Sequence, residues 1–91
     1  MKDTARAVVT VIGKDTVGIL AKVSTACAVS NANVVEVTQS VLEEFFCMIM
    51  IIDIKKAYKQ IDELQAAIQA EVPEMKVHVM HENIFNSMHR I

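Results

Sequence analysis

The residues best suited to bind a small molecule lie between the first strand-like segment and the first helix-like one. Gly13 and Gly18, the only glycines in the chain, flank Asp15 there. Because glycine has no Cβ, a ligand can approach its backbone closely. A helix start also presents backbone N–H groups without acceptors and the positive end of the helix dipole. These groups could hold an amino-acid zwitterion, its carboxylate on the N–H groups and its ammonium on Asp15.

Each of these residues also has a purely structural interpretation. Asp15 precedes the predicted helix, so its carboxylate is a candidate N-cap that accepts the amide of Val17 or Gly18. A capping carboxylate would compete with an incoming anion for the same donors. Gly13 could serve only the turn, Gly18 only the packing of the helix start, and Lys14 is typical of a solvated charge.

The other reactive side chains do not assemble into a catalytic or metal-binding set. His78 and His81 are three residues apart in a predicted strand, so they project from opposite faces and do not favour a shared metal. Cys27 and Cys47 lie in apolar segments without CxxC spacing, which favours free thiols in a reducing cytoplasm. We therefore expect no enzymatic activity, no cofactor and no metal site.

The hydrophobic pattern predicts the elements that position these residues. Strands are expected at 5–12, 34–42, 45–54 and 75–81, and helices at 16–30 and 57–72, with Pro73 ending the second helix. The order β-α-β-β-α-β predicts an α+β fold, the ferredoxin-like plait, with a four-stranded antiparallel sheet and two helices on one face. We expect a single domain over residues 1–91, with residues 82–91 as a C-terminal tail containing one loose helical turn capped by Asn83.

The composition predicts a second buried surface. Hydrophobic residues make up 53% of the chain, above the usual 45–50%. The segment Phe45–Ile52 is apolar at every position, although only one alternate set of a strand can face the helices. The set that faces away needs a partner, which predicts self-association.

Charge and hydropathy exclude two classes of partner. A net charge of −2 without a basic block does not provide a nucleic-acid footprint. The first strand also lacks the aromatic residues that RNA-recognition modules use for stacking. The stretch Phe45–Ile52 is too short to span a bilayer, and no signal-peptide pattern precedes the first strand. We expect a cytoplasmic protein that binds neither nucleic acid nor membrane.

The stretches Ala7–Ser24 and Asn33–Val37 together resemble the ACT domain. In that family the first strand leads into a G-x-D-x-x-G-[IVL]-[LA] turn and helix start. The matching residues here are Gly13, Asp15, Gly18, Ile19 and Leu20. The resemblance covers nearly the whole chain and is strongest to small bacterial and archaeal ACT proteins. It extends to the ACT halves of the glycine cleavage system's transcriptional repressor.

The resemblance implies a regulatory homodimer that binds an amino acid or a similar small metabolite. ACT domains typically pair through their second strands into one continuous sheet, with the effector between the loop of one subunit and the second strand of its partner. The residues implicated here are Gly13, Asp15, Val17, Gly18 and Ile19 from the loop, and Thr38 and Gln39, next to Val37, from the strand. We expect the ligand to alter the dimer and an unidentified protein to read that change. Two dimers could stack into a tetramer.

The same fold also supports other functions. A ligand-free dimerisation module is the main alternative, because only the dimer would then matter. An acylphosphatase needs a cationic fork for a phosphoryl group; the loop offers Lys14, and the only arginines, Arg6 and Arg90, have no evident partners. A metal carrier of this fold would place a CxxC at the first loop, which is absent.

Overall fold

The computed structural model describes residues 5–88, and its elements follow the predicted order with one helix added. The strands are β1 (Arg6–Lys14), β2 (Asn33–Leu42), β3 (Phe45–Asp53) and β4 (Lys76–His81). The helices are α1 (Ile19–Val29), α2 (Ile61–Glu71) and α3 (Glu82–Met88). The ferredoxin-like α+β plait is therefore confirmed. None of these helices is long and apolar enough to cross a membrane.

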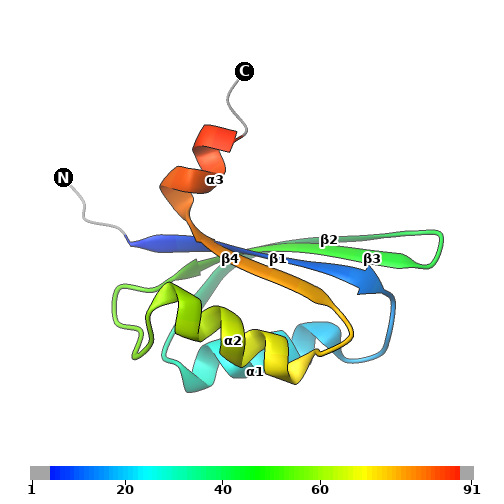
Figure 1. Cartoon of the computed structure of the whole chain (residues 1–91), viewed down its shortest axis with the longest axis horizontal. Coiled ribbons are helices and arrows are strands. Elements are labelled where there is room, and N and C mark those ends of the chain that lie inside the picture. Colours follow the sequence, from blue (N-terminus) through cyan, green and yellow to red (C-terminus); the bar gives the residue numbers. More distant parts are fainter. Residues whose placement is uncertain (1–4, 89–91) are drawn as a thin grey trace.

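The four strands form one antiparallel sheet in the order β2-β3-β1-β4. Helices α1 and α2 cover one face, whereas α3 rises from the opposite face at one end (Figure 1). The β2–β3 hairpin extends beyond the helices at the other end (Figure 1). β2 and β4 are edge strands, so each has one side whose backbone groups pair with no strand among residues 5–88.

The alternation along β3 separates the core from the open face. The residues that face the helices are buried, with at most 7% of their surface exposed: Phe46, Met48, Met50 and Ile52. The intervening residues lie on the open face: Phe45, Cys47, Ile49 and Ile51. The core is completed by Val9 and Val11 of β1 and by Leu64 and Ile68 of α2, all fully buried.

The first helix starts later than predicted, and its cap differs. α1 begins at Ile19 rather than near residue 16, and its N-cap residue is Gly18 with φ 85°. The predicted cap, Asp15, is wrong, because it lies three residues before Gly18 and no side chain caps this helix. Asp15 is held instead through its backbone N–H, which donates to the carbonyl oxygen of Glu44 at 2.9 Å.

The second helix is also shorter than predicted, since α2 begins at Ile61 and not at residue 57. Gln60 and Glu63 form a capping box at its start, and the Gln60 backbone N–H donates to Oε1 of Glu63 at 2.9 Å. Residues 55–59 before it are irregular rather than helical. The end falls just before Pro73, as predicted.

Strand β2 contains an irregularity that the alternating pattern does not reveal. The register with β3 shifts between Val34 and Glu36, so Val35 is an extra residue in a β-bulge. Val34 and Val37 both pack against the core, whereas Val35 is 47% exposed. Val37 and Val41 lie opposite Met50 and Phe46 on the helix-covered face, and the bulge removes Val35 from this alternation.

The C-terminal tail is more regular than predicted. Residues 82–88 form helix α3, and Asn83 is inside it rather than at its cap. The backbone N–H of Asn83 donates to Nδ1 of His81 at 3.1 Å. α3 packs against β1 and β4, and Val8, on the open face, is only 1% exposed. Part of the face that was expected to need a partner is thus covered by the chain itself. Residues 89–91 of the predicted tail, including Arg90, lie outside the described residues.

Candidate functional site

The loop between β1 and α1 is fixed at one point and open at the others. The Asp15 backbone N–H bonds to the Glu44 carbonyl, which ties the loop to the turn of the β2–β3 hairpin. Val17 is 96% exposed, and Asp15 and Thr16 are also exposed, whereas Ile19 is inserted into the core. The loop therefore presents its polar residues to solvent while Ile19 anchors the start of α1.

The two glycines of the loop are required for different reasons. Gly18 has φ +85°, a left-handed conformation that side chains rarely adopt, and a Cβ placed on it would meet nothing within 4 Å. Gly13 sits in β1, where a Cβ would lie 2.8 Å from Sδ of Met75. Gly13 thus allows Met75, just before β4, to pack closely against β1, and Gly18 allows the turn into α1.

The first turn of α1 has unused hydrogen-bond donors. The Gly18 carbonyl accepts the first helical bond from the Lys22 N–H at 3.0 Å. No side chain caps this end, and no acidic residue lies in the first turn. The competition expected between a capping Asp15 and a bound anion is therefore absent, and the N–H groups of residues 19–21 can receive a carboxylate.

The structure does not bring Thr38 and Gln39 to this loop within one chain. Both lie on the edge strand β2, opposite Ile49 and Met48 of β3. Thr38 therefore lies on the open face of the sheet, and Gln39 lies on the helix-covered face, although both are exposed. No hydrogen bond among residues 5–88 joins either side chain to the loop.

The model of the ACT domain family matches residues 5–82. The chain belongs to the ACT domain family. A UPF0237 protein from Listeria monocytogenes is 44% identical over 88 residues, which cover 94% of this chain and 99% of that protein.

Solved structures agree with the family assignment. An ACT domain protein from Streptococcus pneumoniae superposes with a TM-score of 0.76 at 28% identity, covering 91% of this chain and 96% of that one. A glycine cleavage system transcriptional repressor superposes with a TM-score of 0.63 at 15% identity, covering 88% of this chain and 47% of that one. The second likeness shows the shared fold.

This ACT domain contains an ion pair between β1 and the start of α3 that the sequence did not predict. Arg6 Nη2 lies 2.6 Å from Oε2 of Glu82, and Arg6 Nε donates to the same oxygen at 3.2 Å. Arg6 therefore has a carboxylate partner that the sequence does not make evident. The hydrogen bond and the charge of Arg6 lower the pKa of Glu82 below its ordinary value. No local pattern could have revealed a pair separated by 76 positions.

The remaining titratable groups of the ACT domain are dispersed. His78 pairs with Thr10 on the open face, whereas His81 pairs with Ala7, so the two imidazoles lie on opposite faces as predicted. Residues 5–88 contain no group of three side chains able to hold a metal. Cys27 and Cys47 are free thiols, and burial raises the pKa of Cys27 to about 11.

Hollows on the surface of the ACT domain do not coincide with the predicted site. A polar hollow of about 370 Å³ lies at the start of β2 and the end of β3, lined by Asn31, Asn33, Asp53, Lys55 and Lys56. An apolar hollow of about 290 Å³ lies on the open face of the sheet. Its lining residues are Thr10, Ile12, Cys47, Ile49, His78, Met80 and Phe85. Neither of these two hollows is lined by the loop residues, Thr38 or Gln39.

Proposed function

We propose that this ACT domain is a regulatory homodimer that binds an amino acid, or a similar small metabolite, at its subunit interface. ACT domains bind small molecules such as amino acids and often dimerise. The observation that carries the proposal is the uncapped first turn of α1, next to an exposed Asp15. The N–H groups receive the carboxylate of the ligand, and Asp15 receives its ammonium group.

The edge strand β2 supports pairing as the way to enclose this ligand. Eight of its ten residues are exposed, and its outer backbone groups are available to a second strand. Two copies paired antiparallel along β2 would add Thr38 and Gln39 of one chain to the neighbourhood of the other chain's loop. The complete site is therefore proposed to contain Gly13, Asp15, Val17, Gly18 and Ile19 of one subunit with Thr38 and Gln39 of its partner.

In this proposal the protein has no catalytic role and acts in the cytoplasm. Binding across the interface couples ligand concentration to dimer stability, because each ligand contacts both chains. A separate protein that recognises the liganded dimer then receives the signal. The alternative of a ligand-free dimerisation module is favoured by one observation: the loop of a single chain is open rather than hollowed.

A thermal-unfolding screen against the twenty amino acids, with the mass measured by sedimentation in the same buffer, tests the proposal. A ligand at about 100 times its dissociation constant adds about 2.7 kcal/mol of stability, which raises the midpoint of a domain of this size by about ten degrees. We expect Asp15→Ala to abolish the shift. Glu71→Ala, which removes an exposed carboxylate at the end of α2, is the matched control and keeps it. A stable dimer that responds to no amino acid supports the ligand-free module, and a monomer overturns both.

A further inference from the structure

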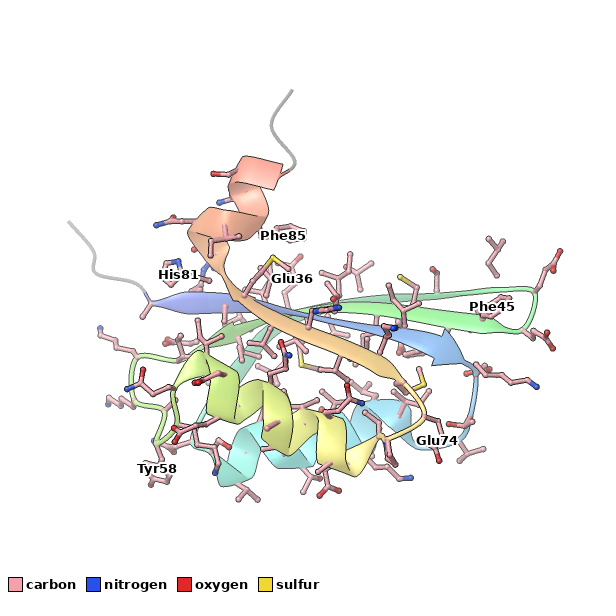
Figure 2. The ribbon with its side chains drawn as sticks, viewed as in Figure 1. Glu36, Phe45, Tyr58, Glu74, His81 and Phe85 are labelled. Carbon is pink, nitrogen blue, oxygen red and sulfur yellow. The ribbon has the colours of Figure 1, made fainter. Side chains whose placement is uncertain are left out.

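The apolar hollow on the open face is built by residues far apart in the chain. Ile12 of β1, Ile49 of β3 and Met80 of β4 form its floor, and Phe85 of α3 stands at its side. In Figure 2, Phe85 points from α3 over the open face of the sheet. Such a concave apolar surface with few polar groups has the character of a small-molecule site.

We propose that this hollow is a second ligand site that binds a small apolar monocarboxylate without an ammonium group. Its volume of about 290 Å³ is close to the lower end of the range for ligand pockets, about 300 Å³. A molecule with one aromatic ring or one branched aliphatic chain fits this size. The site is independent of the proposed interface site, because the sheet separates it from the first turn of α1.

The charges around the hollow select the functional group of the ligand. His78 lines it opposite Thr10, and Lys76 lies opposite Ile12 on the same face. Lys14, paired with Phe45, follows Ile12 along the same face of β1. Lys76 and Lys14 are exposed on this face next to Ile12, and the exposed imidazole of His78 lines the hollow. A carboxylate of the ligand can pair with these groups.

Among residues 5–88, no acidic side chain lines the hollow. Glu36 shares the open face, but it lies on β2 and is separated from β1 by β3. The carboxylate of Glu82 at the start of α3 is bound by Arg6, and Asp53 lies opposite Arg6 at the end of β3. An ammonium group on the ligand would therefore lose its hydration without gaining an anionic partner, at a cost in affinity. This distinguishes the hollow from the loop site, where Asp15 is available to an ammonium group.

The position of α3 favours a small molecule over a second copy of the sheet. α3 rises from the open face beside the hollow, so a flat sheet cannot lie directly across this end (Figure 1). The ion pair between Arg6 and Glu82 joins the start of α3 to β1. A ligand that contacts both Phe85 and the strands can enter where a second sheet is obstructed.

A nuclear magnetic resonance titration of the full chain with 3-phenylpropionate tests the proposal. Phenylalanine is the matched ligand control, because it has the same skeleton and carboxylate with an added ammonium group. We expect 3-phenylpropionate to cause saturable shifts of the Thr10, Ile49 and Met80 methyl signals. Phenylalanine should bind with an affinity lower by a factor of about ten or more. Ile49→Trp, which fills the hollow, should weaken 3-phenylpropionate binding by about tenfold or more. Ile84→Trp, on the exposed side of α3, should leave it unchanged.

Each other outcome decides against the proposal. Shifts that do not saturate, equal affinity for phenylalanine, or equal effects of both tryptophan variants overturn it. The proposal is also overturned if the ligand-free protein dimerises with rising concentration and the same methyl signals shift as it does so. The hollow is then a subunit interface. If Ile49→Trp does not fold, Met80→Trp fills the hollow from β4 and gives the same test. Gly18→Val should abolish an amino-acid response at the loop while leaving 3-phenylpropionate binding intact, so the two proposed sites fail separately.

Discussion

Arg6 and Glu82 connect the first strand of the sheet to the helix that follows its last strand. Both Nη2 and Nε of Arg6 donate to Oε2 of Glu82, at 2.6 and 3.2 Å. The pair lies beside the place where α3 packs on β1 and β4. It joins the start of α3 to β1, close to Phe85 and the apolar hollow.

Removing this pair should loosen α3 without unfolding the sheet. We expect Glu82→Gln to accelerate backbone hydrogen exchange in α3, while amides of β1 and β3 keep their protection. Glu71→Gln, on α2, is the control and should change neither. Equal acceleration in the sheet would show that the pair supports the whole fold instead.

The docking of α3 should also depend on pH. Because Arg6 lowers the pKa of Glu82 in the folded state, the pair stabilises docked α3 fully above the ordinary pKa of 4.5. This contribution is lost as the pH falls through the lowered pKa of the folded state. We expect the α3 amides of the native protein to lose protection below pH 4.5, after correction for the slower intrinsic exchange at low pH, with a smaller loss in Glu82→Gln. An identical pH profile in the two proteins would contradict the assignment.

Substitution of Gly18 should lower stability through backbone strain rather than through steric overlap. Gly18→Ala places a Cβ on a residue with φ +85° where nothing lies within 4 Å, so the cost is the left-handed strain of about 1–2 kcal/mol. Asparagine tolerates this conformation better, and Gly18→Asn should lose less. Urea unfolding of the native protein, Gly18→Ala and Gly18→Asn measures the three free energies of unfolding. Equal losses in the two variants would contradict this explanation.

Substitution of Gly13 should lower stability through steric overlap with a neighbouring side chain. The Cβ of Gly13→Ala would lie 2.8 Å from Sδ and 3.3 Å from Cα of the buried Met75. We expect a loss of about 1–3 kcal/mol, as for other overpacked sites. Shortening Met75 in the double variant Gly13→Ala with Met75→Val should recover part of it. Additive losses in the double variant would exclude this contact as the cause.

The two thiols should react at very different rates. Cys27 is fully buried and its pKa is raised to about 11, so little thiolate forms at pH 8. Cys47 is half-buried on the open face, beside the apolar hollow. We expect a thiol reagent to modify Cys47 first and Cys27 only on unfolding. Mass spectrometry of the single variants Cys27→Ala and Cys47→Ala identifies the reactive thiol.

The sequence by itself determined the order of the six main elements and the apolar character of β3. Period-two and helical patterns are local, so they can be detected without knowing what packs against what. The family motif around Gly13, Asp15 and Gly18 was equally local. These features were sufficient to predict the ferredoxin-like sheet and the family.

Only the tertiary structure decided which set of β3 side chains forms the core, because an alternating pattern fits either face equally well. It also made Gly18 rather than Asp15 the N-cap residue of α1, and it bound the Asp15 backbone N–H to the carbonyl oxygen of Glu44 from another part of the chain. The bulge at Val35 and the pairing of Arg6 with Glu82 depend on neighbouring strands and on residues 76 positions apart. Such features arise from long-range packing, which leaves no periodic trace in the sequence.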